Sequence, residues 1–472
     1  MSILNTFRAF TEGLFSLSEG AKLYDVEPLS CPETESITQR CMDAYQGNPS
    51  WLDPDNGIIT INFARTVCME VGRLTTLGVS IEVTGGARAK WLQEQIELMY
   101  YNLRKWVEYS AACGIVMLKP NGKNIDVYFP DEFAITDATG GDITGAVFLS
   151  TETSEDGKKV FSRYEYHWFD DEGVYHIQNI CFVQNRNGGE KRRVAIDETP
   201  WNMLDEEATV PGLEKPLFAP MQMPNANNHD IDAPIPVPIT ADALAELEGL
   251  DVAFSRFAKE IYDSKRLVLL DSDRVLPAAG NRLKQYSGSM ELSRNELGLP
   301  DMVKNVWGDG KESFYQEINP AMNTDVRILG MNAMLSQIGY KCGFSNGYFT
   351  FNEKDSKVIT ATQVEADQQR TIQFVKDCRD QFERAMYTLI KALDEFADLY
   401  GLAPAGSYDA TFNFGDITYS YEEDKQNWWK YVLASKVPAW MYFVKFEGMT
   451  EEEAKAMQAE MDAAQPSLFE EG

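Results

Sequence analysis

The sequence contains few of the side chains on which enzyme and metal sites depend. Its 472 residues include three histidines, and its seven cysteines are odd in number and form no CxxC pair. None of the motifs GxGxxG, GxxxxGKS/T or HExxH occurs. We therefore expect no catalytic residue, no metal, no cofactor and no disulfide framework, and we expect a reducing compartment.

Long apolar runs and basic charge are also scarce. No stretch approaches eighteen uninterrupted apolar residues, so we expect no transmembrane helix and no membrane partner. Lysine and arginine number 43 against 73 acidic residues, which gives a net charge of −30. This sign does not suit a protein that grips DNA by neutralising phosphates. It suits a wall along which DNA slides, and ordinary solubility explains it equally well.

The composition is that of a globular protein, with 44% hydrophobic and 12% aromatic residues. A chain of this length usually forms about two to four domains. Residues 87–113 have helical spacing, and strands are predicted at 115–118 and 125–129 around an Asn121-Gly122 turn. A helix beside hairpins predicts an α+β unit.

Strands dominate the region that follows. We predict an antiparallel meander of four strands at 146–151, 161–169, 173–178 and 181–186. His167 and His176 lie in this region without a third ligand at a metal spacing, so we favour structural roles for both. The acidic residues 170–172 precede a glycine, which is typical of a turn rather than of an acid/base pair.

One compact basic run follows the meander and consists of Lys191, Arg192 and Arg193. A solvated strand edge is one interpretation, and contact with an acidic partner or with DNA is the other. Residues 195–239 contain eight prolines and therefore predict an extended connection.

Three helices are predicted in the second half, at residues 240–264, 324–341 and 362–400. The first has apolar residues three or four apart, a spacing that suits packing on a neighbouring helix or on its own subunit: Leu244, Leu247, Leu250, Phe254 and Phe257. The third would be about 55 Å long. A capping box of Thr362 and Glu365 begins it, and Gly401 ends it.

A loop rich in glycine and aromatic residues leads into the long helix, and the four charges in its second half sum to zero. After Pro404 we expect a short strand at 408–417 and aromatic-rich helices at 422–435 and 437–447. A further helix is opened by a capping box from Thr450 to Glu453. The tryptophans of this segment carry more apolar surface than it can bury alone, so we expect it to pack on another part of the chain or on another subunit.

The order of these features resembles the portal proteins of tailed bacteriophages of the siphophage type. Within residues 342–365, a glycine-rich turn, an aromatic strand, a charged loop and Thr360-Ala361-Thr362 followed by Val364-Glu365 lead into the long helix. Residues 210–230 precede the helix from 240 in the same order as in that family, and residues 421–461 resemble its crown helices. The resemblance extends over about residues 55–460 as an ordered series.

The resemblance implies an α+β, portal-type fold with a wing, stem helices, a β-rich clip and a helical crown, assembled as a ring around a central channel. Its parts would be an N-terminal arm and wing (1–135), a β-rich segment including the clip (136–238), a stem helix (239–265), a wing return (266–342), a tunnel loop (343–361), the long helix (362–401), a wing strand (402–420), and crown helices with an acidic tail (421–472).

The resemblance also implies roles for particular residues. Lys191, Arg192 and Arg193 would form a clip contact with a partner, and the five apolar residues of the helix from 240 would pack the stem. The tunnel loop would line the DNA channel with Gly343, Phe344, Asn346, Tyr348, Phe351, Glu353, Lys354, Asp355 and Lys357.

The implied role is structural and not enzymatic. A dodecamer at one capsid vertex would let double-stranded DNA enter and leave, binding it transiently and without sequence specificity. The implied partners are the terminase large subunit, head-tail adaptor proteins, and the major capsid and scaffold proteins. The protein would assemble in the host bacterial cytoplasm and reside in the virion. The alternatives are a carboxylate-dependent hydrolase with an aromatic cleft and another head-tail connector component.

Overall fold

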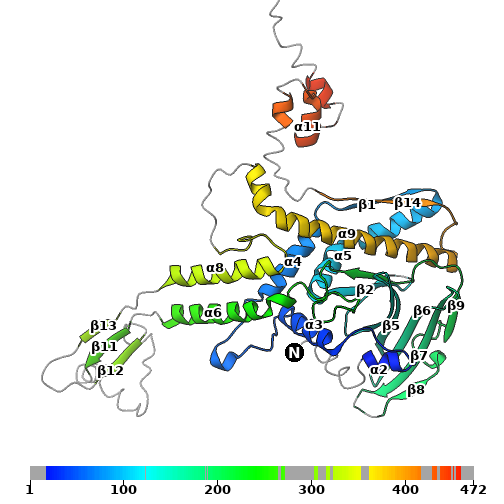
Figure 1. Ribbon diagram of the computed structural model, residues 1–472, viewed down its shortest axis with the longest axis horizontal. Helices are drawn as coiled ribbons and strands as arrows, with labels where there is room; N and C mark the ends of the chain where they lie inside the picture. Colours follow the sequence, from blue (N-terminus) through cyan, green and yellow to red (C-terminus); the bar gives the residue numbers. More distant parts are fainter. Residues whose placement is uncertain are drawn as a thin grey trace, which may run out of the picture. The chain divides into compact units, whose positions relative to one another are not determined.

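The computed structural model describes residues 17–122, 124–186, 188, 190–263, 267–271, 302–306, 315–318, 323–351, 361–415, 428–432, 436–447, 450 and 453–458. Helices account for 45% of the chain and strands for 23%, so the predicted α+β class is confirmed as a mixture of helices and sheets. The chain divides into two compact units (Figure 1). The first comprises Met1–Thr76 and Glu82–Thr411, and the second comprises Leu77–Ile81 and Phe412–Gly472.

The largest sheet is an antiparallel meander in the first unit. Its order is β4 (Phe133–Thr139), β5 (Asp142–Thr153), β6 (Lys159–Phe169), β7 (Tyr175–Asn185) and β8 (Arg192–Val194), and β9 (Glu207–Val210) pairs with the other half of β7. The meander predicted from the sequence is therefore confirmed in pattern. The predicted break at 179–180 is wrong, because β7 is one strand that pairs with β6 along its whole length.

A smaller sheet packs against the meander. It has the order β10 (Ala219–Gln222), β2 (Ile115–Pro120) and β3 (Ile125–Tyr128). Residues of both sheets form one core cluster, which includes Ile115, Met117, Phe148 and Phe218. The side chains of Phe148 and Phe218 meet edge to face with their ring centroids 5.2 Å apart, a favourable aromatic geometry.

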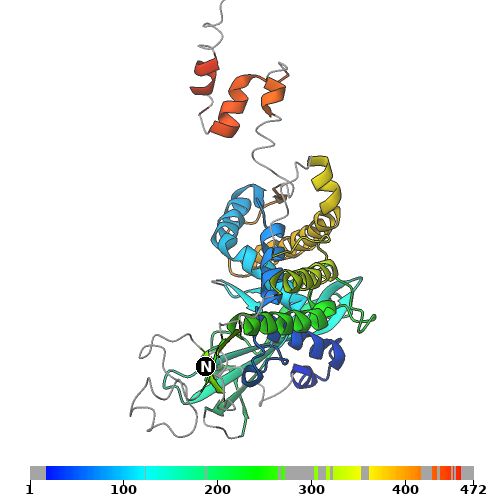
Figure 2. The same cartoon turned by 90° about the vertical axis from the view of Figure 1, so that its left-hand side faces the viewer.

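Helices cover the smaller sheet. α5 (Ala87–Cys113) packs on α3 (Pro32–Tyr45), α4 (Phe63–Thr75) and β2, and the short α2 (Leu17–Lys22) lies on the meander (Figure 2). The long helix α9 (Ala361–Leu399) contacts α4, α5, β2 and β10. Its predicted length and end are confirmed, since Gly401 has φ +59° and the N–H of Leu402 bonds back to the Ala397 carbonyl at 2.9 Å. The side chains of the predicted capping box at its start lie outside the described residues.

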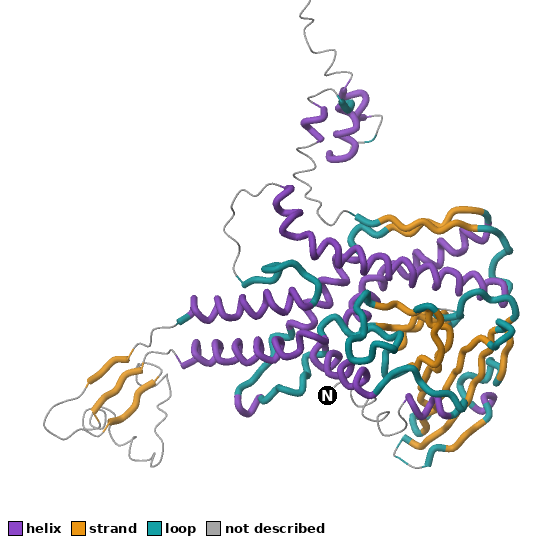
Figure 3. The backbone as a smooth tube through the Cα atoms, in the orientation of Figure 1, coloured by secondary structure: helices purple, strands orange, loops and turns teal. Residues whose placement is uncertain are grey.

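The remaining helices of this unit form a pair (Figure 3). α6 (Leu244–Asp263), which continues a short 3-10 turn (Ala241–Ala243), lies beside α8 (Thr324–Lys341). α8 falls within the segment predicted as a wing return, and it packs beside the helix predicted as the stem. Along the chain, a small sheet of β12 (Met302–Val306), β11 (Leu267–Asp271) and β13 (Tyr315–Ile318) comes between the two helices.

The second unit contains short helical segments. Helical residues 428–432 contact α11 (Ala439–Glu447) through Trp429 and Tyr442, whose ring centroids are 4.9 Å apart. The capping box predicted from Thr450 to Glu453 is confirmed by reciprocal bonds of 3.1 Å and 3.4 Å. A two-stranded sheet of β1 (Ser80–Gly85) and β14 (Tyr408–Asn413), most of whose residues belong to the first unit, confirms the strand predicted after Pro404.

Candidate functional site: the α6–α8 pair and the loop after α8

Ion pairs at both ends fix how α6 and α8 lie against each other. Glu246 near the start of α6 bonds Lys341 at the end of α8 at 2.6 Å, and Glu260 bonds Arg327 at 2.9 Å. The helices are therefore antiparallel. Each pair is partly exposed and contributes only about 0–1 kcal/mol, so the pairs select the register more than they stabilise it.

The interior of the pair is apolar. Met331, Leu335 and Ile338 of α8 are buried on the face towards the rest of the chain. Among the predicted stem residues, Leu244, Leu247 and Leu250 are also buried within the chain, whereas Phe254 and Phe257 are half-buried. The first three side chains therefore pack within the subunit.

The opposite face of α8 carries a second apolar stripe. Val326 and Leu329 are 70% and 72% exposed, and Ala333 continues the stripe one turn later. Ile261 at the end of α6 is 48% exposed. Large aliphatic side chains at helical spacing on an outer face are the pattern by which one helix packs on another.

The loop after α8 is tightly packed at its start. At Gly343 φ is +91°, and a β-carbon there would lie 2.6 Å from the Phe374 ring, so only glycine fits. The Phe344 side chain is fully buried and contacts the rings of Tyr348, Phe349 and Phe374. It has no surface to offer a channel, and we correct its predicted channel-lining role to a core role.

Hydrogen bonds hold the rest of this loop on α8 and α4. Asn346 accepts a bond from Ser336, and Tyr348 donates one to Glu70 of α4. The N–H of Phe351, whose side chain is 49% exposed, donates to Asn332 of α8 at 2.9 Å. Glu353, Lys354, Asp355 and Lys357 of the predicted tunnel loop lie outside the described residues, so their predicted role stays a prediction.

One pair of bonds ties the loop directly into α9. The Ser345 N–H donates to the Thr371 hydroxyl at 2.8 Å, and the Thr371 N–H donates to the Ser345 hydroxyl at 3.2 Å. Both residues are buried. A side chain that takes a backbone N–H of a helix interrupts the ladder and bends the helix, and Figure 1 shows α9 bent near its first turns.

The contact between Tyr348 and Glu70 raises the pKa of the phenol and lowers the pKa of the carboxyl group. Burial raises the pKa of Tyr348, and its bond to the carboxylate raises that pKa further. Burial alone would raise the pKa of Glu70, but hydrogen bonds from Arg73 and Tyr348 outweigh it and hold that pKa below its usual range. The pair is therefore a neutral phenol on a carboxylate, which anchors the loop at neutral pH.

The predicted clip residues lie elsewhere. Arg192 and Arg193 are exposed on β8, and Figure 1 shows β8 well apart from α6 and α8. The Lys191 ammonium lies 4.9 Å from the centroid of the Tyr164 ring and 5.0 Å from that of Phe182. The basic run thus forms a sheet edge, and the structure does not bring it together with the loop after α8.

Among the described residues, the group of ionisable side chains that most resembles an enzyme site is buried in the core. Glu165 bonds Lys119 of β2 and Arg163, and its other oxygen lies 2.9 Å from His167. The second ring nitrogen of His167 lies 2.7 Å from the Tyr175 hydroxyl, which also accepts the Leu217 N–H at 3.0 Å. Because the ionised Glu165 can only accept, we assign the proton of a neutral His167 to the nitrogen facing Glu165, and the other nitrogen then accepts from the Tyr175 hydroxyl.

Burial and charge explain the titration of this cluster. Burial opposes the ionised form of Glu165, but Lys119 and Arg163 outweigh burial and hold its pKa well below the usual range. Burial lowers the pKa of His167. Because His167 is 2% exposed, no substrate reaches it, and the structural role predicted for it agrees with this arrangement. In the described part of the chain, no group of three or more His, Cys, Asp or Glu side chains could hold a metal.

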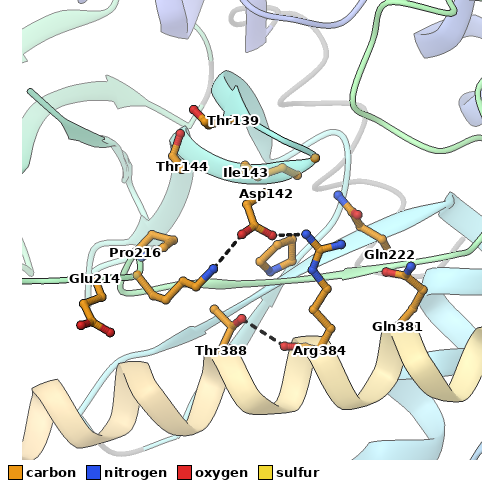
Figure 4. A pocket seen from close by; sticks show the side chains of 13 residues that line it. Thr139, Asp142, Ile143, Thr144, Glu214, Pro216, Gln222, Gln381, Arg384 and Thr388 are labelled. Carbon is orange, nitrogen blue, oxygen red and sulfur yellow. Dashed lines mark hydrogen bonds and ion pairs between the residues drawn. The ribbon is translucent and has the colours of Figure 1, made fainter. Parts of the chain in front are cut away.

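A cavity of about 220 Å³ lies where the β4–β5 turn meets α9 (Figure 4). Asp142 reaches across it to Lys215 at 2.7 Å and to Arg384. Burial would raise the pKa of Asp142, but bonds from both cations lower it, so this carboxyl stays ionised at neutral pH and cannot act as a general acid. Nothing in the sequence marks this contact, because its members are far apart along the chain.

None of the described helices combines the length and the hydropathy needed to cross a membrane. Neither a scan against protein-family models nor a search among curated proteins finds a match to this sequence.

Proposed function

We propose that this chain is the subunit of a portal, a ring-shaped channel at one vertex of a viral capsid through which double-stranded DNA is packaged and ejected. One observation carries the proposal. α8 has apolar residues on two opposite faces, and the described residues cover only one of them. In a closed ring, each subunit presents one patch to the neighbour on one side and a different patch to the neighbour on the other.

The second face of α8 is large enough to support such a contact. Burying an exposed valine or leucine side chain contributes about 1.5–3 kcal/mol, and Val326 and Leu329 are both available. On α6, the half-buried Phe254 and Phe257 and the exposed Ile261 form a complementary apolar surface for a neighbour. Under this proposal α6 and α8 together form the stem, and the ring has twelve copies, as the family resemblance implies.

The acidic charge and the loop after α8 fit a conduit. A net charge of −30 per copy repels phosphates over a Debye length of about 8–10 Å, so DNA slides without adhering. Hydrogen bonds to α4, α8 and α9 anchor the first part of the loop, residues 343–351, and the charged residues follow it along the chain. We propose that these residues, Glu353, Lys354, Asp355 and Lys357, line the channel, together with the exposed Asn346 and Phe351.

The proposed role is structural, and the energy for packaging comes from a partner. We propose that the ring is a platform for the terminase large subunit and the head-tail adaptors, and that the major capsid and scaffold proteins hold it in the shell. Assembly would take place in the bacterial cytoplasm, and the finished ring would belong to the virion. DNA contacts would be transient and independent of sequence.

The mass of the purified protein in solution tests the proposal. We expect a species near twelve times 53.3 kDa by native mass spectrometry, with a central hole in negative-stain images. A chain that remains a monomer at every concentration, and also in the presence of its capsid and scaffold proteins, contradicts the ring.

Paired substitutions on α8 test whether the exposed stripe of Val326 and Leu329 is the contact through which the ring assembles. Val326→Glu with Leu329→Glu places charge in the proposed interface, and we expect it to shift the protein towards monomers while the circular dichroism spectrum is retained. Val326→Ile with Leu329→Met keeps the stripe apolar and should preserve the ring. Equal assembly of both double variants would show that this stripe is not an interface.

A further inference from the structure

One corner of the six-stranded sheet is basic in a chain that is acidic overall. The strand pairing brings its members together from three segments: Lys158 and Lys159 at the start of β6, Arg186 after β7, and Lys191, Arg192 and Arg193 at β8. The nearby acidic residues are Glu155, Asp156 and Glu190. The corner therefore carries more positive than negative charge, which the net charge of the chain conceals.

At the same corner, none of the described strands pairs with the outer side of β8. β8 is the last strand in the order of the sheet, and on its inner side it pairs with Cys181, Phe182 and Val183 of β7. Arg192 and Arg193 are both exposed. The outer backbone groups of such a strand are available to another chain, which can add as a further strand.

The cations flank this edge on both faces of the sheet. Arg193 lies opposite Phe182, on the face of Tyr164, where the Lys191 ammonium also sits 3.2 Å from the Tyr164 hydroxyl. Arg192 lies opposite Val183 and so points to the other face. A rigid polyanion lying on one face would meet only some of these charges, whereas a ligand in the plane of the sheet would meet all of them.

We propose that the β8 edge binds an extended acidic segment of a partner protein, which joins the sheet as a seventh strand. Its backbone would pair with β8, and carboxylates on alternate residues would meet Lys191 and Arg193 on one face and Arg192 on the other. This deepens the proposed function by giving the chemistry of the partner at the predicted Lys191–Arg193 contact. It requires only a monomer, so a failure of ring assembly and a failure of peptide binding are separate results.

The probe is a short fluorescent peptide of alternating Glu and Val, titrated with the full-length protein and followed by anisotropy. Its matched control has Pro in place of Val, which keeps the charge but removes backbone donors. Arg192→Glu with Arg193→Glu should weaken binding of the Glu-Val peptide by about tenfold or more. Arg65→Glu with Lys90→Glu, at exposed positions on α4 and α5, changes the net charge equally and should leave binding unchanged.

Four outcomes decide the proposal. Binding that depends on β8 and is weakened in the proline peptide supports it. No binding of the Glu-Val peptide overturns it, and equal binding of the proline peptide overturns strand addition. If a DNA duplex binds through the same arginines while the peptide does not, the corner is a nucleic-acid contact instead. Should the β8 variant lose its circular dichroism spectrum, Lys158→Glu with Lys159→Glu tests the same corner from β6.

Discussion

The core between the two sheets buries charged side chains, whereas the α6–α8 pair leaves apolar side chains exposed. Between the sheets, Lys119, Arg163, Glu165 and His167 are buried, and each contacts another member of the group. On α8, by contrast, Val326 and Leu329 remain more than two-thirds exposed.

The difference indicates which region is complete within one chain. Burying charges is tolerated only where partners compensate them, and the sheets supply those partners themselves. An exposed apolar stripe gains nothing from water and gains stability only from a neighbour. We therefore regard the sheets as self-sufficient, and we propose that the helix pair depends on another copy.

The strongest test of this contrast removes the central carboxylate of the buried group. Glu165→Ala would leave Lys119 and Arg163 buried without their counter-charge, and we expect a loss of about 3–5 kcal/mol in the free energy of unfolding in urea. Glu152→Ala on the exposed side of β5 is the matched control and should change stability by less than about 0.5 kcal/mol. Similar losses in both variants would mean that the buried charge group is no more sensitive to the loss of a carboxylate than an exposed position is.

A second test compares the two faces of α8 with the same substitution. Leu335→Ala empties a buried site and should cost about 2–5 kcal/mol of unfolding free energy. Leu329→Ala should cost less than about 0.5 kcal/mol when measured on the monomer. A large loss for Leu329→Ala in the monomer would mean that its face is already covered within the chain.

The pH dependence of stability reports on His167. Burial lowers its pKa below the ordinary 6.5, so on acidification the unfolded chain takes up a proton that the folded chain resists. Stability is therefore complete above pH 6.5 and falls below it, by at most about 1.4 kcal/mol per pH unit for this group. Urea midpoints should fall over this window in the wild type and in His176→Gln, and fall less in His167→Gln. An unchanged slope in His167→Gln would contradict this assignment.

The smallest effect is expected at the cavity between the β4–β5 turn and α9. Asp142→Asn removes both ion pairs, yet all three side chains are 39–49% exposed, so solvent screening limits the loss to about 1 kcal/mol or less. Thermal melting of this variant beside Arg384→Gln would measure it. A loss above about 2 kcal/mol would place Asp142 with the buried charges rather than with the surface pairs.

Local patterns predicted the elements better than their contacts. The apolar spacing of the long helix and the chemistry of Gly401 and of the Thr450 capping box act within a few residues, so the sequence shows them. The predicted break in β7 was wrong because Asn179, a residue common in turns, instead bonds the Asp205 carbonyl from within the strand.

The contacts of the candidate site could be predicted only where the spacing of apolar residues along a helix indicates a buried face. The spacing of Leu244, Leu247 and Leu250 indicated a packed face, and burial at that face is observed. The contacts between Lys119 and Glu165, and between Asp142 and Arg384, join elements that no local rule relates. Phe344 was misassigned because an aromatic residue after a glycine looks the same in sequence whether its loop projects or folds back.

The antiparallel contact between α6 and α8 also determines where this chain tolerates change in length. Residues 264–323 separate the two helices along the chain, while ion pairs at both ends select the register in which the helices pack. The entropy of closing a loop grows only with the logarithm of its length, so doubling this segment would cost about 0.6 kcal/mol. Insertions, deletions or a replaced module between α6 and α8 are therefore a route by which related chains could diverge, or be engineered, without disturbing the body of the protein.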